Sequence, residues 1–234
     1  ILDINKGSAD LSRRAIVYSM QGLSFREYLN MFHNIEIQTH TLADIVEHRI
    51  ELPEKFRPYA YFQSYLEKGY YPFSKEDQFH IRLQQVINTT LEVDIPQYSE
   101  MSISTARKLK QLLTIIAQSV PFKPNMSSIA IMLGVSRNNL SDYFLYLEES
   151  VLISQLRDGV GGIRGLGKVD KVYLDNPTLM YNLGKEISNI GNIRETFFLN
   201  QTRVEQEVIT SPISDFQIAD YTFEVGGKNK KQKQ

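Results

Sequence analysis

The chain has no cysteine among its 234 residues. It can therefore form neither disulfide bonds nor thiolate metal sites, and a reducing, cytoplasmic setting is the simpler expectation. Histidine is scarce too, and no histidine has a second one at the spacing of a zinc site. The four are His33, His40, His48 and His80. Metal binding through sulfur or paired imidazoles is not predicted.

Long apolar runs and an excess of one charge are also missing. No run approaches the roughly 20 residues that span a bilayer, and no signal peptide is visible, so we expect no membrane segment. Lys and Arg number 26 against 27 Asp and Glu, for a net charge of -1. This balance excludes a polycationic nucleic-acid binder, so any nucleic-acid surface must be a local patch. The apolar content of 42% suffices for a buried core.

A phosphate-binding loop of the form G-x-x-x-x-G-K-[ST] is absent. The glycine cluster at 159–167 lacks the Lys-Ser/Thr pair. No Met precedes the opening segment Ile1–Ile4, which has the composition of a sheet interior. We therefore expect an internal or C-terminal fragment of a longer protein, without ATP hydrolysis of its own.

Residues 21–119 have the pattern of an all-helical unit. Ser24 and Glu27 form the sequence of a capping box, in which the serine accepts from the third helical N–H and the glutamate reaches back. This predicts a helix over 25–32. Thr41 is a second candidate N-cap, and it predicts a short helix immediately after it.

A glycine and a proline interrupt this helical unit. The segment Gly69–Pro72 is predicted to end one helix, because proline disfavours helix at the residue before it. Ser74 is predicted to cap the following long helix, which would run to about Leu91. A further long helix is expected before the boundary at Pro121.

Residues 120–190 have the pattern of a winged helix-turn-helix. The pattern begins with a short helix (127–133), a turn (134–136) and a second helix (137–149). A strand (151–156), a glycine-rich wing (158–162) and a returning strand (171–174) follow. The second helix opens with Arg137, Asn138 and Asn139, where base-reading side chains lie in such units.

The charge of this region leaves two interpretations open. Residues 127–175 include five basic and six acidic residues, for a net charge of -1. DNA-binding modules, in contrast, gain affinity by neutralising phosphates. Arg164, Lys168 and Lys171 would nevertheless form a basic wing. The unit is therefore either a DNA contact or a winged helix that packs against protein.

Residues 191–234 are predicted to be a small α/β unit with a helix over 192–199 followed by three short strands. Glu195, Asp215 and Glu224 are placed as in a metal-dependent nuclease core, where hard carboxylate oxygens bind Mg²⁺ and activate a water. Asp215 and Glu224 are the metal-ligand candidates. The fold class predicted for the whole chain is thus mainly α with an α+β C-terminal part.

The nuclease interpretation has a gap at one position. Gly226 stands where such a core usually has a lysine that positions the water or stabilises the transition state. Lys228 would substitute only if a turn brought it back. The alternative is a nuclease fold without activity, in which the acids are surface or capping residues.

Five segments together resemble a bacterial and archaeal AAA+-type ATPase family with a fused C-terminal domain of unknown function. The first three carry the family patterns "L-S-F-x-E-Y" (Gly22–Leu29), "Y-L-x-x-G-x-x-P" (Tyr65–Pro72) and "K-x-x-K-x-Y-x-x-D/N" (Lys168–Asn176). The other two, Gly191–Phe197 and Asp215–Lys228, match the end of the fused domain. The resemblance implies the end of an ATPase core at 1–20, a helical lid at 21–119, a winged helix at 120–190 and a truncated PD-(D/E)xK nuclease-like unit at 191–234.

The resemblance also implies ATP and Mg²⁺ as cofactors of a full-length protein. Arg13 and Arg14 would face a phosphate or a neighbouring subunit, or form a solvated basic pair. Gly69 and Pro72 would shape a turn near the nucleotide base, or only end a helix.

Three functions follow as hypotheses. The first is the C-terminal portion of an ATP-binding protein that couples nucleotide state to a nucleic-acid or protein contact. The second is a non-enzymatic DNA-binding or interaction module. The third is a Mg²⁺-dependent nuclease. The oligomeric state stays open.

Overall fold

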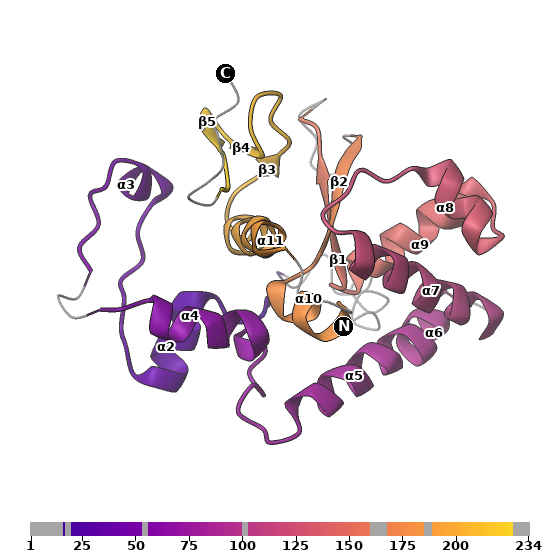
Figure 1. The fold of residues 1–234 in the computed structure, drawn as a ribbon, viewed down its shortest axis with the longest axis horizontal. Helices are drawn as coiled ribbons and strands as arrows, with labels where there is room; N and C mark the ends of the chain where they lie inside the picture. Colours follow the sequence, from indigo (N-terminus) through magenta and orange to yellow (C-terminus); the bar gives the residue numbers. More distant parts are fainter. Residues whose placement is uncertain are drawn as a thin grey trace.

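The structure is a computed structural model, and it describes residues 16, 20–52, 56–99, 103–159, 168–184 and 189–226. Most of these residues are helical, and two small antiparallel sheets lie in the second half of the chain (Figure 1). The structure is a mixed α+β fold, which agrees with the coarser part of the expectation, whereas the helical lid and the winged helix stay predictions. Within these ranges no helix has the length and apolar composition that crossing a bilayer requires.

The first two described helices begin at the predicted N-caps, and both caps are capping boxes. Helix α2 (Phe25–His33) starts after Ser24, whose hydroxyl accepts from the Glu27 N–H while Glu27 accepts from the Ser24 N–H. Helix α3 (Leu42–Val46) starts after Thr41 in the same way. In both, local side-chain hydrogen bonds satisfy amides that would otherwise lack partners.

Helix α4 (Tyr59–Ser64) continues into the π-helical turn η1 (Tyr65–Gly69), which ends where the sequence predicts. The predicted cap at Ser74 is wrong, because the next helix begins only at Phe79 and Ser74 is buried. Residues 71–78 instead form successive turns. These turns bring Tyr71, Phe73 and Phe79 into ring contact, and this aromatic packing outweighs the local capping preference.

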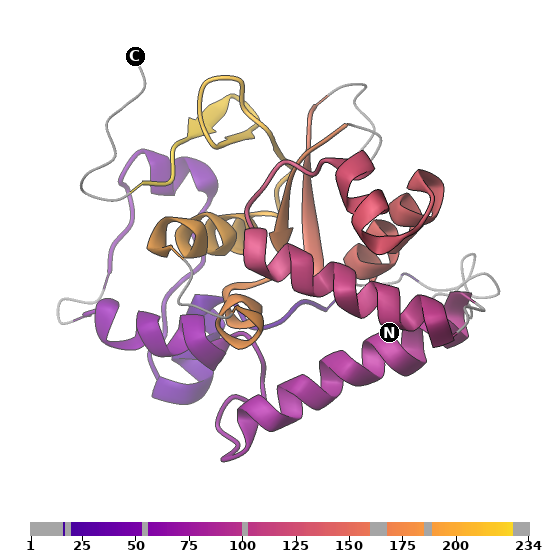
Figure 2. The same ribbon diagram turned by 45° about the vertical axis from the view of Figure 1, so that its right-hand side comes forward.

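A long helical rod and a partner helix form one side of the molecule. The rod consists of α5 (Phe79–Thr89), the π-helical turn η2 (Thr90–Asp94) and α6 (Ile95–Ser99). Helix α7 (Ile103–Ser119) lies beside the rod in both views (Figures 1 and 2). The rod therefore extends past the predicted end near Leu91.

The middle of the chain forms two short helices and a hairpin. Helices α8 (Met126–Leu133) and α9 (Arg137–Glu149) are joined by a tight turn, as predicted. Strands β1 (Ile153–Arg157) and β2 (Val169–Leu174) pair antiparallel, with Ile153 opposite Leu174. The segment between them at 160–167 lies outside the described residues, as does Arg164.

The last part begins with a helix that the sequence interpretation missed, α10 (Pro177–Leu183). Its signal was present, because Asn176 caps it and proline occupies the first helical position. Helix α11 (Ile190–Thr202) covers the predicted 192–199. The three predicted strands are confirmed in shorter form, in the antiparallel order β3 (Val208–Ile209), β4 (Phe216–Ile218) and β5 (Tyr221–Phe223).

One apolar core continues across the expected unit boundaries. It contains buried side chains from Tyr28 in α2 to Ile193 in α11, with Ile116, Leu140 and Val172 between them. A smaller cluster places α11 against the C-terminal sheet; it consists of Leu156, Tyr173, Leu199 and Phe216. The helical unit, the two short helices and the hairpin are therefore held together by apolar contact.

Gly22 allows a close approach that a larger residue would block. A Cβ at Gly22 would lie against the Tyr70 ring and 2.6 Å from the Tyr70 carbonyl oxygen. We expect Gly22→Ala to lower the free energy of unfolding by roughly 1–3 kcal/mol, because neither the buried ring nor the backbone can yield easily. Gly191→Ala, where the nearest atom is 3.3 Å away, should change stability by less than about 1 kcal/mol. Urea unfolding compares the two, and equal losses would contradict the packing argument.

Candidate nucleic-acid interface

The turn between α8 and α9 is specified by local chemistry. Helix α8 is capped by Asn125, whose side chain accepts from the Ser128 N–H, and it ends at Gly134 with a φ of 61°. A left-handed φ favours glycine there. Helix α9 then starts after Ser136, whose hydroxyl accepts from the Asn139 N–H. These contacts fix the first turn of each helix and the end of α8.

The hairpin is attached to the start of this helical pair. Phe122 and Val172 exchange two backbone hydrogen bonds, of 3.3 and 2.9 Å. The pair forms an isolated β-bridge on the side of β2 away from β1. This bridge brings the segment that carries Lys123 against the hairpin.

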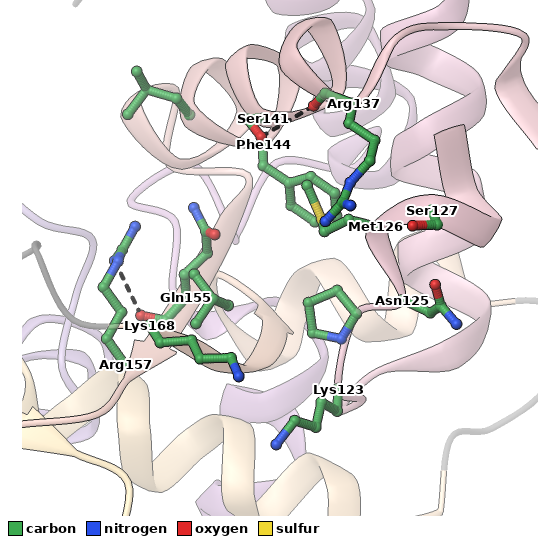
Figure 3. A pocket seen from close by; sticks show the side chains of 13 residues that line it. Lys123, Asn125, Met126, Ser127, Arg137, Ser141, Phe144, Gln155, Arg157 and Lys168 are labelled. Carbon is green, nitrogen blue, oxygen red and sulfur yellow. Dashed lines mark hydrogen bonds between the residues drawn. The ribbon is translucent and has the colours of Figure 1, made fainter. Parts of the chain in front are cut away.

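A pocket of about 780 Å³ opens between the two helices and the hairpin (Figure 3). Its volume lies within the usual range of ligand pockets. We call it the basic pocket; its lining residues are Lys123, Pro124, Asn125, Met126, Ser127, Arg137, Ser141, Phe144, Leu145, Gln155, Arg157, Lys168 and Val169. Figure 3 shows Arg137 reaching from α9 toward Met126, with Lys123 and Lys168 on the opposite side.

The charge of the basic pocket has one sign. Among the described residues, its lining includes four cations and no acidic residue, although the chain as a whole carries -1. The cations come from three places in the chain: Lys123 before α8, Arg137 at the start of α9, and Arg157 and Lys168 at the adjoining ends of β1 and β2. Such a concentration attracts an anion.

Two of the four cations already have carboxylate partners outside the lining. Lys123 donates to Asp170 at 2.7 Å, and this hydrogen bond is the main cause that lowers the pKa of Asp170. Arg157 makes a bidentate contact with Glu148, at 2.6 and 3.0 Å. These partners hold the two side chains in place.

The other two pocket cations are Arg137 and Lys168. Among the residues that the structure describes, neither side chain forms an ion pair, although the Lys168 backbone N–H donates to the Asp158 carboxylate at 2.7 Å. Within the described part of the chain, the ion pairs of the pocket are those of Lys123 and Arg157. Arg137 and Lys168 are also exposed. They are the pocket charges available to an incoming anion.

The residues predicted at the start of α9 separate onto different faces. Arg137 lines the pocket, whereas Asn138 and Asn139 are exposed but lie outside its lining. By helical spacing, Asn138 shares its face with Asp142 and Glu149. The outward face of α9 is therefore acidic rather than basic.

Two of the predicted nuclease acids lie together around Lys171, which the sequence pattern assigned to the basic wing. Lys171 Nζ is 3.6 Å from Glu195 Oε2 and 3.8 Å from Asp215 Oδ1. Tyr173, one pleat further along β2, donates from its hydroxyl to Glu195 at 3.2 Å. Burial raises the pKa of Tyr173, and the nearby Glu195 charge adds to the rise. Lys171 thus lies on strand β2 of the hairpin, whereas the nuclease pattern expects its lysine at position 226, after the last C-terminal strand.

The third acid and the expected lysine do not complete this cluster. Glu224 is exposed just after β5, and Lys228 lies outside the described residues. Within the described ranges, no three acidic or histidine side chains gather in a way that would hold a metal ion. Metal binding by Asp215 and Glu224, and nuclease activity, stay predictions.

The residues predicted near a nucleotide are only partly described. Arg13 and Arg14 lie outside the described residues. Gly69 is buried, and a Cβ there would lie 2.6 Å from the Tyr65 ring and 2.9 Å from the Tyr28 ring. Its small size therefore has a packing reason. A role of Gly69 and Pro72 at a nucleotide base stays a prediction.

The sequence interpretation missed half of the pocket cations. Lys123 was passed over because its approach to the hairpin depends on the Phe122–Val172 bridge. Arg157 was counted among the basic residues of the region, but nothing in the sequence places it beside Arg137. Lys168 was predicted and does line the pocket.

Comparison with known proteins gives a family and one distant relative. The family described as "Domain of unknown function (DUF8612)" matches residues 59–193. "Uncharacterized protein MJ1637" of Methanocaldococcus jannaschii is 24% identical over 159 residues, or 64% of this chain. The match spans 34% of that protein's length. No solved structure matches.

Proposed function

We propose that this chain, which belongs to the DUF8612 family, is a nucleic-acid-binding module. The description of the family names no activity, so the proposal is argued from the structure. Helices α8 and α9 with the β1–β2 hairpin have the element order of a winged helix-turn-helix. The observation that carries the proposal is the basic pocket, whose described lining residues include four cations and no acid. Phosphates are the commonest partners of such a surface in this architecture.

Charge reversal in the pocket tests this function. In Arg137→Glu/Lys168→Glu, we expect affinity for duplex DNA at low salt to fall about tenfold or more, because phosphate contacts are lost and repulsion is added. The matched control is Arg26→Glu/Arg107→Glu, which changes net charge equally at exposed residues of α2 and α7. Fluorescence anisotropy measures both, and circular dichroism checks folding. Equal losses, or no binding by the unmutated chain at low salt, would end the proposal.

A second proposal is that this module belongs to an ATP-controlled protein. Its support is that two segments of the ATPase resemblance meet: the Leu23 N–H donates to the Tyr70 carbonyl at 2.8 Å, and the Tyr65 hydroxyl donates to the Leu23 carbonyl at 2.8 Å. The two segments are thus in direct contact, as a helical lid would require. Sequencing upstream of Ile1 tests it, since without a phosphate-binding loop there the proposal fails.

A further inference from the structure

The outward face of α9 is a poor surface for reading bases. Asp142 is exposed on it and Glu149 is half-buried. A recognition helix lying in the major groove has phosphates on both sides. Two carboxylates on that face would be repelled by these phosphates. The charges therefore favour contact along the side of α9 that faces the hairpin.

The basic pocket also lacks a platform for unpaired bases. Proteins that bind single strands stack bases on exposed aromatic rings. Phe144 is the aromatic residue among those described as lining the pocket, and it is 3% exposed. The apolar part of the lining is otherwise aliphatic. The pocket is suited to a charged backbone rather than to flipped or single-stranded bases.

The pocket's cations divide into held and available groups. Lys123 and Arg157 are held by Asp170 and Glu148, so a phosphate would have to compete with those carboxylates. Arg137 and Lys168 approach the pocket from α9 and from the hairpin (Figure 3). A phosphate that contacts Arg137 or Lys168 displaces only water and counterions from the side chain. Two direct phosphate contacts therefore follow from the geometry.

We propose that the basic pocket is a two-phosphate site for the backbone of duplex nucleic acid, formed by Arg137 and Lys168, while α9 remains outside the major groove. The site rests on the nucleic-acid-binding function proposed above. Binding through it is independent of sequence, because phosphates carry no base information. Asp170 competes with the ligand for Lys123, so the Lys123–Asp170 pair limits affinity.

The salt dependence of binding tests the number and identity of the contacts. For the unmutated chain and duplex DNA of random sequence, log K should fall against log salt with a slope of about -1.8. Arg137→Ala and Lys168→Ala should each reduce the slope by about 0.9, with unfolding temperature unchanged. Asn138→Ala and Asn139→Ala should leave affinity and slope unaltered. Asp170→Asn should strengthen binding severalfold by releasing Lys123.

The outcomes separate this inference from the broader function. If no duplex binds at low salt, both proposals fail. If duplex binds but Arg137→Ala and Lys168→Ala leave the slope unchanged, only the two-phosphate site is overturned. Loss of binding in Asn138→Ala together with a sequence preference would instead place α9 in the major groove. Tighter binding of single-stranded than of duplex DNA would likewise overturn the site.

Discussion

Replacing Arg203 with alanine is expected to lower the free energy of unfolding by roughly 3–5 kcal/mol. Arg203 follows α11 and contacts Asp175, whose side chain is 1% exposed at the end of β2. It also donates to Ser154 of β1. Removing the guanidinium leaves a buried carboxylate without its cation, which is the costly way to break such a pair.

Other polar groups cannot replace Arg203. Asn176 donates to the Asp175 carboxylate at 3.2 Å, and Asn200 donates to the Asp175 carbonyl at 3.0 Å. These are neutral donors. They satisfy hydrogen bonds but do not offset a buried charge. The loss should therefore exceed that of an ordinary hydrogen bond.

The effect of Arg203→Ala should depend on pH in a defined direction. Burial raises the pKa of Asp175, and the Arg203 charge opposes that rise. Without Arg203, the folded-state pKa lies further above the unfolded value, so stability is present at low pH and lost as pH rises. The deficit relative to the unmutated chain should be larger at about pH 8 than at about pH 5.

Chemical unfolding at the two pH values measures this prediction. Arg194→Ala on α11, for which no ion pair is found within the described residues, is the matched control and should cost less than about 1 kcal/mol. The double variant Arg203→Ala/Asp175→Asn should recover part of the loss, because the carboxylate is removed. A deficit of Arg203→Ala below about 1 kcal/mol, or one that grows as pH falls, would contradict the prediction.

Leu140→Ala is expected to cost about 2–5 kcal/mol. Leu140 is fully buried and belongs to the core that joins α9 to α7 and the hairpin. Truncation removes apolar contacts and leaves a cavity that close-packed neighbours fill only in part. Because α9 carries Arg137, the same change should also weaken DNA binding through the pocket.

The matched control is Leu145→Ala on the same helix. Leu145 is 47% exposed at the pocket, so its truncation should change stability by no more than about 0.5 kcal/mol. Urea midpoints compare the two variants. Similar losses of stability in the two variants would show that the buried face of α9 around Leu140 does not anchor the helix.

Local sequence signals predicted much of this fold. The capping boxes at Ser24 and Thr41 and the α8–α9 turn at Gly134 lie where their residues indicate. Each depends on hydrogen bonds or φ preferences within a few residues. The failure at Ser74 marks the limit of such signals, because aromatic contacts decided that segment.

The candidate sites could be predicted only in part. Arg137 and Lys168 were identified, but their pairing across one pocket depends on the bridge at Phe122. Lys171 was counted in the sequence as a wing residue, whereas it lies beside Glu195 and Asp215. Its partners are more than 20 residues away in the chain, beyond the range of any local pattern.

The sequence by itself determined most of the helical and strand segments, the capped helix starts at Ser24 and Thr41, the turn at Gly134 and the absence of cysteine chemistry. Those features depend on residue type and short-range spacing. The tertiary structure decided which charges are neutralised and which face an opening, as Lys123 with Asp170 and Arg157 with Glu148 show. Charge interactions depend on distance in space and on burial, and neither is set until the core has packed.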